Sequence, residues 1–368
     1  MKRMLNSQIT LFVSFLFILS CSNNNSENGG AKAPVFLEFI KKERFAVPVE
    51  GKLSGVGLFY QPSGSKSFFI LDEAKSTVYR LDVGSQGIQV YAQLPFDNVE
   101  YFSVNEEENC TVAVTPDTVH LFFGESEEFL SIPLGRINTE AFTTVLSLGF
   151  VPVVLNNKVY LHHFPDIPET YKSKMFYSQP VEVVYDLSSG TYETLSKALY
   201  PEKYRQFSFG YIFSPYRNLL NDEKMVYTFP NDDLAYVLSI EDNSLTSYEF
   251  GVRTEYEQKG VDILEAVFVD DKVYEKLFAR NAFYVFPTFA PLAGHYLRAM
   301  LVKKDSTQFT RPVVYSVFDT DFNYIGESKP IENGLGVLLD SDKGLMGVEF
   351  NNDSLRVFDL SWEPIASP

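Results

Sequence analysis

Hydrophobic and polar residues alternate with a period of two along most of this chain. Clear examples are 78–82 (VYRLD), 207–213 (FSFGYIF) and 313–318 (VVYSVF). Short clusters of turn-forming residues separate them, such as 84–87 (GSQG) and 188–190 (SSG). Alternation predicts half-buried β-strands, and Gly, Ser, Asn and Asp predict tight turns. The pattern therefore predicts an all-β fold, in which short helices compete only in 194–204 and 261–277.

The predicted strands come in pairs that repeat. Each unit has an alternating strand with a central Tyr or Phe, a tight turn and a second alternating strand. A repeat of about 40–50 residues made of strand pairs is typical of β-propellers. The segment 35–49 is left over and is expected to pair with the last blade, covering an exposed sheet edge. We predict six blades, near 51–97, 98–136, 137–197, 205–251, 260–328 and 333–364.

Seven blades are an alternative, because the third and fifth segments are long. A pair of β-sandwiches and an open β-solenoid are further alternatives for a repetitive all-β chain. No strong WD or Gly-His signature is present in the sequence, so a propeller here would not be of the WD40 type.

The N-terminus has the features of a lipoprotein signal. Lys2 and Arg3 precede an apolar run at 9–19 that is too short to span a bilayer. Ser20 and Cys21 then resemble the lipobox of Gram-negative lipoproteins, in which the cysteine is acylated. A plain secretory signal and an anchor helix are the alternatives. We predict a signal peptide at 1–20, lipidation at Cys21, a disordered tether at 21–34 and one propeller domain at 35–368.

The residues after Cys21 indicate where the protein is located in the cell. The segment 22–34 (SNNNSENGGAKAP) has no apolar periodicity and suits a flexible tether. Ser22 stands where an inner-membrane retention signal would place Asp, so the outer membrane is favoured. The choice between its periplasmic and surface leaflets stays open. The membrane is thus one expected partner, through the lipid anchor.

Composition and motifs limit the partners and the catalytic groups that this protein is expected to have. The chain of 368 residues has a formal charge of −17, which disfavours nucleic acid as a partner. After lipidation Cys110 is the one remaining cysteine, and its strand-like setting predicts a buried small residue. Four histidines are present, and the adjacent His162 and His163 would point to opposite faces of a strand. We find no nucleophile elbow, phosphate loop or metal motif, and assign no catalytic residue, metal or cofactor.

Two aromatic and basic clusters are the candidate ligand-binding residues. The tyrosines and arginines of the first are expected in loops at the ends of a strand, where Arg could hold a carboxylate or phosphate and Tyr could offer an apolar face. A core role, with the arginines paired to acids, is the alternative. The candidates are Tyr204, Arg205, Tyr216 and Arg217 around the predicted strand 207–213, and His295, Tyr296 and Arg298 in the second cluster. The second cluster also contains Tyr284, Phe286 and Phe289.

Signal, tether and divergent Phe/Tyr-rich strand pairs together resemble uncharacterised Bacteroidetes-type lipoproteins with a six-bladed, TolB-like propeller. The segments 200–215 (YPEKYRQFSFGYIFSP) and 294–302 (GHYLRAMLV) are the most family-like. The resemblance implies fold and address but no activity. We favour a non-enzymatic binding or scaffold protein for an envelope protein, peptide or glycan. The alternatives are a carboxylate- or metal-dependent hydrolase or lyase at the channel, and a sensor or carrier of an anionic small molecule held by Arg205 or Arg298.

Overall fold

The computed structural model describes residues 33–49, 58–62, 64–107, 109–123, 129–134, 142–144, 151–165, 170–210, 212–303, 311–351 and 354–365. Every described strand and helix lies within one compact unit, Val35–Pro368. The predicted signal and Cys21 fall outside the described residues. Among the residues that the structure describes, no helix is long and apolar enough to cross a membrane.

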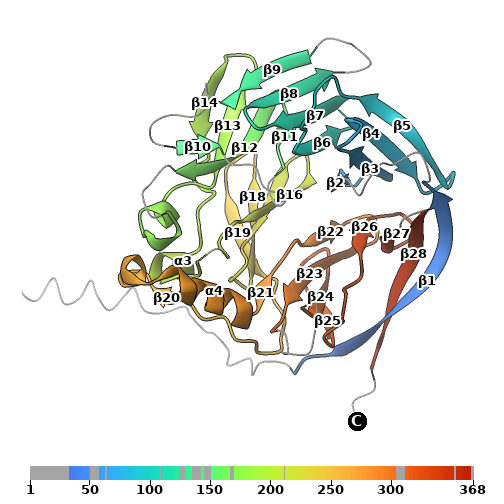
Figure 1. The fold of residues 1–368 in the computed structure, drawn as a ribbon. Coiled ribbons are helices and arrows are strands. Elements are labelled where there is room, and N and C mark those ends of the chain that lie inside the picture. Colours follow the sequence, from blue (N-terminus) through green and yellow to red (C-terminus); the bar gives the residue numbers. More distant parts are fainter. Residues whose placement is uncertain are drawn as a thin grey trace, which may run out of the picture. The chain divides into compact units, whose positions relative to one another are not determined.

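Three of the sheets are four-stranded meanders, in which strands adjacent in sequence are also paired (Figure 1). Their inward-facing positions are buried and apolar, as the alternation predicts. The first contains β2 (Leu58–Tyr60), β3 (Ser67–Asp72), β4 (Thr77–Asp82) and β5 (Gly87–Gln93). The second contains β6 (Tyr101–Asn105), β7 (Cys110–Thr115), β8 (Thr118–Phe123) and β9 (Phe129–Pro133). The third contains β16 (Tyr216–Asn221), β17 (Lys224–Thr228), β18 (Leu234–Ser239) and β19 (Leu245–Glu249).

Two larger sheets complete the main architecture. A five-stranded sheet contains β10 (Phe142–Thr144), β11 (Val153–Leu155), β12 (Lys158–Pro165), β13 (Glu182–Asp186) and β14 (Thr191–Thr194). A nine-stranded sheet contains β21 (Phe283–Tyr284), β22 (Thr288–Ala290), β23 (His295–Leu301), β24 (Val313–Asp319), β25 (Tyr324–Ser328), β1 (Phe36–Pro48), β26 (Val337–Leu339), β27 (Met346–Asn351) and β28 (Ser354–Pro364).

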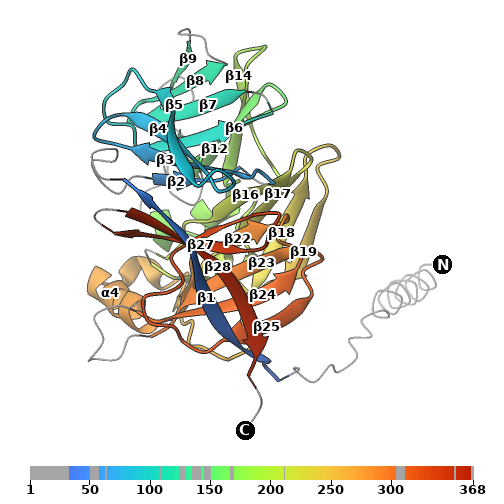
Figure 2. The ribbon, with the colours of Figure 1, turned by 90° about the vertical axis from the view of Figure 1, so that its right-hand side faces the viewer.

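The N-terminal strand β1 holds the nine-stranded sheet together. It pairs antiparallel with β28 from Leu37 opposite Pro364 to Pro48 opposite Ser354. It also pairs parallel with β25 through Phe36 and Leu37. The expectation that 35–49 pairs with the last strands of the chain is therefore confirmed. Figure 2 shows β1 running beside β28.

Turn chemistry explains why the outer strand pairs form where the sequence predicts them. Asp82, Asp186 and Asp319 each end a strand, and each uses Oδ1 to accept from two backbone N–H groups of the following turn. These bonds fix the turn locally. Because they favour the charged carboxylate, they contribute to lowering the pKa of all three side chains.

Helices are few and short. The helix α3 covers Glu202–Gln206 and α4 covers Asp271–Arg280, with 3₁₀ turns at η1 (Thr170–Lys172), η2 (Phe176–Ser178) and η3 (Ala266–Phe268). Asp270 caps α4 by accepting from the backbone N–H of Lys272 at 2.8 Å. Both regions where helices were expected to compete thus contain a helix.

The prediction of one alternating strand over 207–213 is wrong. Among the described residues of this stretch, the only strand is β15 (Phe207–Ser208), which pairs with β20 (Val261–Asp262) in a separate two-stranded sheet. Gly210 adopts a φ of +62°, and a Cβ there would lie 2.5 Å from the ring of Tyr274. The chain therefore turns where the pattern predicted that it continues. Phe207 is left 39% exposed, whereas Phe209 is buried.

The hydrophobic core lies between neighbouring sheets. Phe69 of β3 packs in one cluster with Phe102 of β6, and Cys110 of β7 packs in another with Leu161 of β12. Further clusters join each sheet to the next along the chain. One cluster returns to the start by packing Phe68 of β3 against residues of β26, β27 and β28. The unit is all-β with a propeller-like arrangement of sheets, and Cys110 is buried as predicted.

Candidate binding cavity

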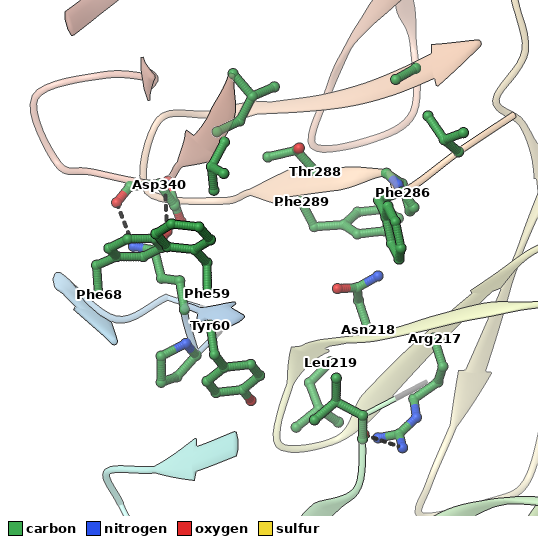
Figure 3. Close-up of a pocket in the computed structure, with 18 of the residues that line it drawn as sticks. Phe59, Tyr60, Phe68, Arg217, Asn218, Leu219, Phe286, Thr288, Phe289 and Asp340 are labelled. Carbon is green, nitrogen blue, oxygen red and sulfur yellow. Dashed lines mark hydrogen bonds between the residues drawn. The ribbon is translucent and has the colours of Figure 1, made fainter. Parts of the chain in front are cut away.

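A cavity of about 610 Å³ lies where strands of several sheets meet (Figure 3). Its described walls are contributed by β2 and β3, by β11, by β16, by β22, β23, β24 and β26 of the nine-stranded sheet, and by residues next to these strands. Its volume lies in the range of sites for small molecules. The described lining residues are mainly apolar: Leu58, Phe59, Tyr60, Pro62, Phe68, Val151, Val153, Leu219, Val285, Phe286, Pro287, Phe289, Ala299, Val313, Tyr315, Gly336, Val337 and Leu338.

Aromatic rings form two facing walls of the cavity. Phe59 and Phe68 stack on one side, with ring centroids 5.6 Å apart and planes inclined by 13°. Phe286 and Phe289 lie on the opposite side (Figure 3). Phe286 is 48% exposed and packs against Tyr216, with ring centroids 4.9 Å apart. A flat apolar group between these walls would meet ring faces on both sides.

Five neutral polar side chains are among the described lining residues: Tyr60, Gln61, Asn218, Thr288 and Tyr315. The hydroxyl of Tyr315 accepts from the backbone N–H of Leu335 at 3.0 Å. The amide of Asn218 points into the space between the two aromatic walls (Figure 3). Burial raises the pKa of Tyr60 to about 12, against the effect of the nearby positive charge of Arg217, so its hydroxyl is neutral near pH 7. The side chains of Asn218, Tyr60 and Thr288 form no hydrogen bond to another described residue.

Arg217 lies at the cavity wall, but its charge is compensated within the protein. Its Nε lies 3.3 Å from Oε1 of Glu182, and both side chains are buried. Its Nη2 donates to the carbonyls of Val151 at 2.8 Å and Tyr160 at 3.3 Å. Burial raises the pKa of Glu182, while Arg217 and a hydrogen bond from Tyr227 oppose that shift.

Asp340 is the other charged lining residue, and it is also satisfied. Its carboxylate accepts from the backbone N–H groups of Leu292 at 3.0 Å and Ala293 at 2.8 Å. Burial raises the pKa of Asp340, although these bonds act in the opposite direction. The amide of Gln61 is hydrogen-bonded as well. Its Nε2 donates to the backbone carbonyls of Ser65 and Asp340, and its Oε1 accepts from the backbone N–H of Asp340.

A second cavity of about 220 Å³ lies beside the first. It shares Tyr60, Pro62, Val153 and Leu219 with the larger cavity and adds, among others, Ser103 of β6 and Glu106 just after that strand. Among the described residues, no group of three or more His, Cys, Asp or Glu side chains is placed to hold a metal ion.

The structure separates the predicted ligand-binding residues, and the prediction that Tyr204, Arg205, Tyr216 and Arg217 lie in loops is wrong. Tyr204 is on α3 and fully buried, where its hydroxyl accepts from the backbone N–H of Asn231 at 3.0 Å. Arg205 pairs with Glu202 on the same helix at 2.9 Å, with both side chains partly exposed. Neither Tyr204 nor Arg205 is among the described lining residues.

Tyr216 and Arg217 are on β16, and of the seven candidates only Arg217 is among the described lining residues. Tyr216 supports the cavity indirectly through its contact with Phe286. Burial raises the pKa of Tyr216 to about 12, partly offset by the charge of Arg298.

His295, Tyr296 and Arg298 all lie on β23. The Nδ1 of His295 is 2.7 Å from the carbonyl of Ala293, and its ring packs edge-on against Trp362. Tyr296 packs against Phe289 and Phe322 in the core.

Arg298 is fully buried between two sheets. Its Nη2 donates to the carbonyl of Phe229 at 2.8 Å, and its guanidinium lies 4.2 Å from the ring centroid of Tyr284. Burial lowers the pKa of Arg298, and the surrounding acidic and phenolic groups act in the opposite direction. These contacts are those of a core residue that joins sheets.

Most of the cavity was not predicted from the sequence. Phe59 and Asn218 carry no motif, and they are separated by 159 positions in the sequence. Phe286 and Phe289 belong to the second aromatic and basic cluster, and they line the cavity where His295, Tyr296 and Arg298 do not. The structure brings these residues together because β2, β16 and β22, which carry or adjoin them, belong to three different sheets.

Comparisons with solved structures agree with this fold. A member of the DUF4221 family from Bacteroides vulgatus matches with a TM-score of 0.66 and 14% identity, covering 90% of this chain and 100% of that one. A protein from Bacteroides fragilis, described as exported, matches with a TM-score of 0.56 and 13% identity, covering 89% and 96%. No protein-family model matches the chain, and no curated protein matches it. At these identities the likeness shows the fold alone, an all-β propeller-like arrangement.

Proposed function

We propose that this chain is a non-enzymatic binding protein whose propeller holds a small molecule in the cavity of about 610 Å³. The observation that carries the proposal is the lining itself. Apolar and aromatic side chains from strands of four sheets converge with a few neutral polar groups, which is the usual composition of a ligand site. Such convergence requires residues that are remote in sequence to face one another across a shared centre.

We further propose that the propeller has six blades. The nine-stranded sheet then counts as two blades, β22–β25 and β26–β28 with β1, joined through the parallel contact between β1 and β25. Support comes from the cavities, to whose described lining every proposed blade contributes a strand: β2, β6, β11, β16, β22 and β26, with further residues from β3, β23 and β24. In this arrangement β1 closes the ring by supplying the outer strand of the last blade.

The proposal also includes the cellular location of the protein. A signal at 1–20, lipidation at Cys21 and a tether at 21–34 would hold the domain 35–368 at the outer membrane, so the ligand would come from the envelope. The exported character stated for the Bacteroides fragilis protein supports an envelope location. The anchor is tested by Cys21→Ala, which should move the protein from the membrane fraction to the soluble fraction and abolish palmitate labelling. Cys110→Ala is the matched control and should change neither.

Ligand binding is tested with the neutral fluorescent probe N-phenyl-1-naphthylamine and the chain from residue 22 onward, which contains the whole compact unit. We expect saturable enhancement of probe fluorescence that is lost in Val337→Trp, because the indole would fill the cavity. Val90→Trp is the matched control, since Val90 is 62% exposed on β5. Equal binding by both variants would place the probe outside the cavity and overturn the proposal.

A further inference from the structure

We infer that the cavity selects an uncharged, ring-bearing small molecule with a hydrogen-bonding edge, and that Asn218 holds that edge. This inference rests on the proposed binding function and names the ligand class. It starts from a contrast within the cavity lining. The charged groups already have partners, whereas three neutral polar groups have none among the described residues.

The two charged groups of the lining are compensated within the protein, which disfavours a charged ligand. An anion would need the guanidinium of Arg217, which is already paired with Glu182 and two backbone carbonyls. A cation would need Asp340, whose oxygens accept from two backbone N–H groups. A charged ligand would therefore lose its hydration without gaining an uncompensated counter-charge from the described lining, which is unfavourable.

The two aromatic walls of the cavity favour a ligand with a ring. The stacked pair of Phe59 and Phe68 faces Phe286 and Phe289 across the cavity (Figure 3). Flat apolar rings pack against such faces with little loss of conformational entropy, because they have few rotatable bonds. Phe286, at 48% exposure, leaves apolar area that a ligand ring would cover.

Asn218 favours a ligand with a hydrogen-bonding edge. Its amide can both donate and accept, and it points between the two aromatic walls (Figure 3). Pairing with a ligand amide or hydroxyl would satisfy it, while a pure hydrocarbon would bury it without a partner. Thr288 and the neutral hydroxyl of Tyr60 offer further neutral hydrogen-bonding groups in the same lining.

The test uses three naphthalene competitors that share one ring system. Bound N-phenyl-1-naphthylamine is displaced by 2-naphthamide, naphthalene or 2-naphthoate, each titrated against the chain from residue 22 onward. We expect 2-naphthamide to bind about tenfold more tightly than either of the others, since one buried, well-formed hydrogen bond is worth about that factor. In Asn218→Leu the advantage of 2-naphthamide over naphthalene should disappear, while naphthalene binds at least as well as before.

Two results would overturn the inference while leaving the proposed function intact. One is tighter binding of 2-naphthoate than of 2-naphthamide, which would indicate an anion site. The other is an unchanged preference for 2-naphthamide in Asn218→Leu, which would assign the edge to another group. If the probe itself fails to bind, or binds equally to Val337→Trp, the proposed function fails and the inference fails with it. Thermal unfolding of each variant identifies any loss of binding that comes from misfolding.

Discussion

Arg217 on β16 and Glu182 on β13 form an ion pair at 3.3 Å whose side chains are 1% and 0% exposed. The pair therefore bridges two neighbouring sheets at the wall of the cavity. Tyr227 donates to the second carboxylate oxygen of Glu182. Each charge is tolerated in the interior only because the other compensates it.

Replacement of Arg217 by Leu should lower the free energy of unfolding by about 3–5 kcal/mol, because it leaves the carboxylate of Glu182 buried without its counter-charge. Urea denaturation followed by circular dichroism measures the loss. The double variant Glu182→Leu with Arg217→Leu should lose less than Arg217→Leu alone, since it leaves no unpaired charge.

The matched control is Arg205→Leu, which removes a partly exposed ion pair with Glu202. That substitution should cost less than about 1 kcal/mol. A loss for Arg217→Leu no larger than for Arg205→Leu would contradict the role given to the buried pair.

Local features of the sequence were sufficient to predict the outer strand pairs. The pairs β4–β5, β13–β14, β18–β19 and β24–β25 all fall where alternation and turn residues placed them. In three of them an Asp at the strand end organises the turn through its own neighbours, so nothing distant in sequence is required. The pairing of β1 with β28 was also predictable, as an unpaired strand at one end of a repetitive sheet protein needs a partner.

The cavity could not be predicted in the same way. Whether Tyr204 or Phe59 faces a shared centre depends on how the sheets are placed around it, and no local pattern encodes that placement. Arginines in an acidic chain were predicted to bind a ligand. Arg298 instead contacts backbone carbonyls and Tyr284 within the core. Alternation over 207–213 failed for a related reason, because Gly210 turns against Tyr274, which is 64 positions away in the sequence.

Gly326→Ala should disturb the contact that joins β1 to β25. A Cβ at Gly326 would lie 2.7 Å from the side chain of Leu37 and 2.8 Å from the backbone oxygen of Val35. Because the backbone of Val35 cannot move without shifting β1, we expect a loss of about 1–3 kcal/mol in the free energy of unfolding. Differential scanning calorimetry and urea denaturation both report it.

Gly87→Ala is the control for that substitution. A Cβ at Gly87, the first residue of β5, meets only the hydroxyl of Ser85, at 3.4 Å. It should change stability by less than about 0.5 kcal/mol. Similar losses for the two variants would mean that the packing of β1 on β25 contributes nothing specific.

Cys110 should be chemically inert in the folded protein. Its side chain is fully buried in the cluster that contains Val112 and Leu161. In the chain from residue 22 onward, a thiol reagent such as Ellman's reagent should react only after urea unfolds the protein. Cys110→Ser should cost about 1–3 kcal/mol by burying a hydroxyl, unless that group finds a hydrogen-bond partner, and more than Cys110→Ala. Rapid reaction of the native thiol would show that the cluster opens.

His120 should make the folded protein sensitive to mild acid. Its ring stacks on Phe96 with centroids 3.7 Å apart and planes inclined by 22°, and its Nδ1 lies 2.9 Å from the hydroxyl of Ser131. Burial lowers the pKa of His120 from its ordinary value of 6.5, although the charge of Asp117 opposes that shift. The unfolded chain therefore binds a proton at a higher pH than the folded chain does. The stability contributed by neutral His120 is complete above pH 6.5 and falls as the pH decreases towards the pKa of the folded state.

The measurement is the free energy of unfolding in urea between pH 8 and pH 5, together with NMR titration of the imidazole C–H signals. Wild type should lose more stability over this interval than His120→Phe, which keeps a ring against Phe96 but cannot take up a proton. His163 also has its pKa lowered by burial, so His163→Phe should remove a separate part of the same dependence. If His120→Phe kept the full pH dependence of the wild type, the proton would have to bind elsewhere. The neutral imidazole packed on Phe96 would then not be the acid-sensitive element of this sheet.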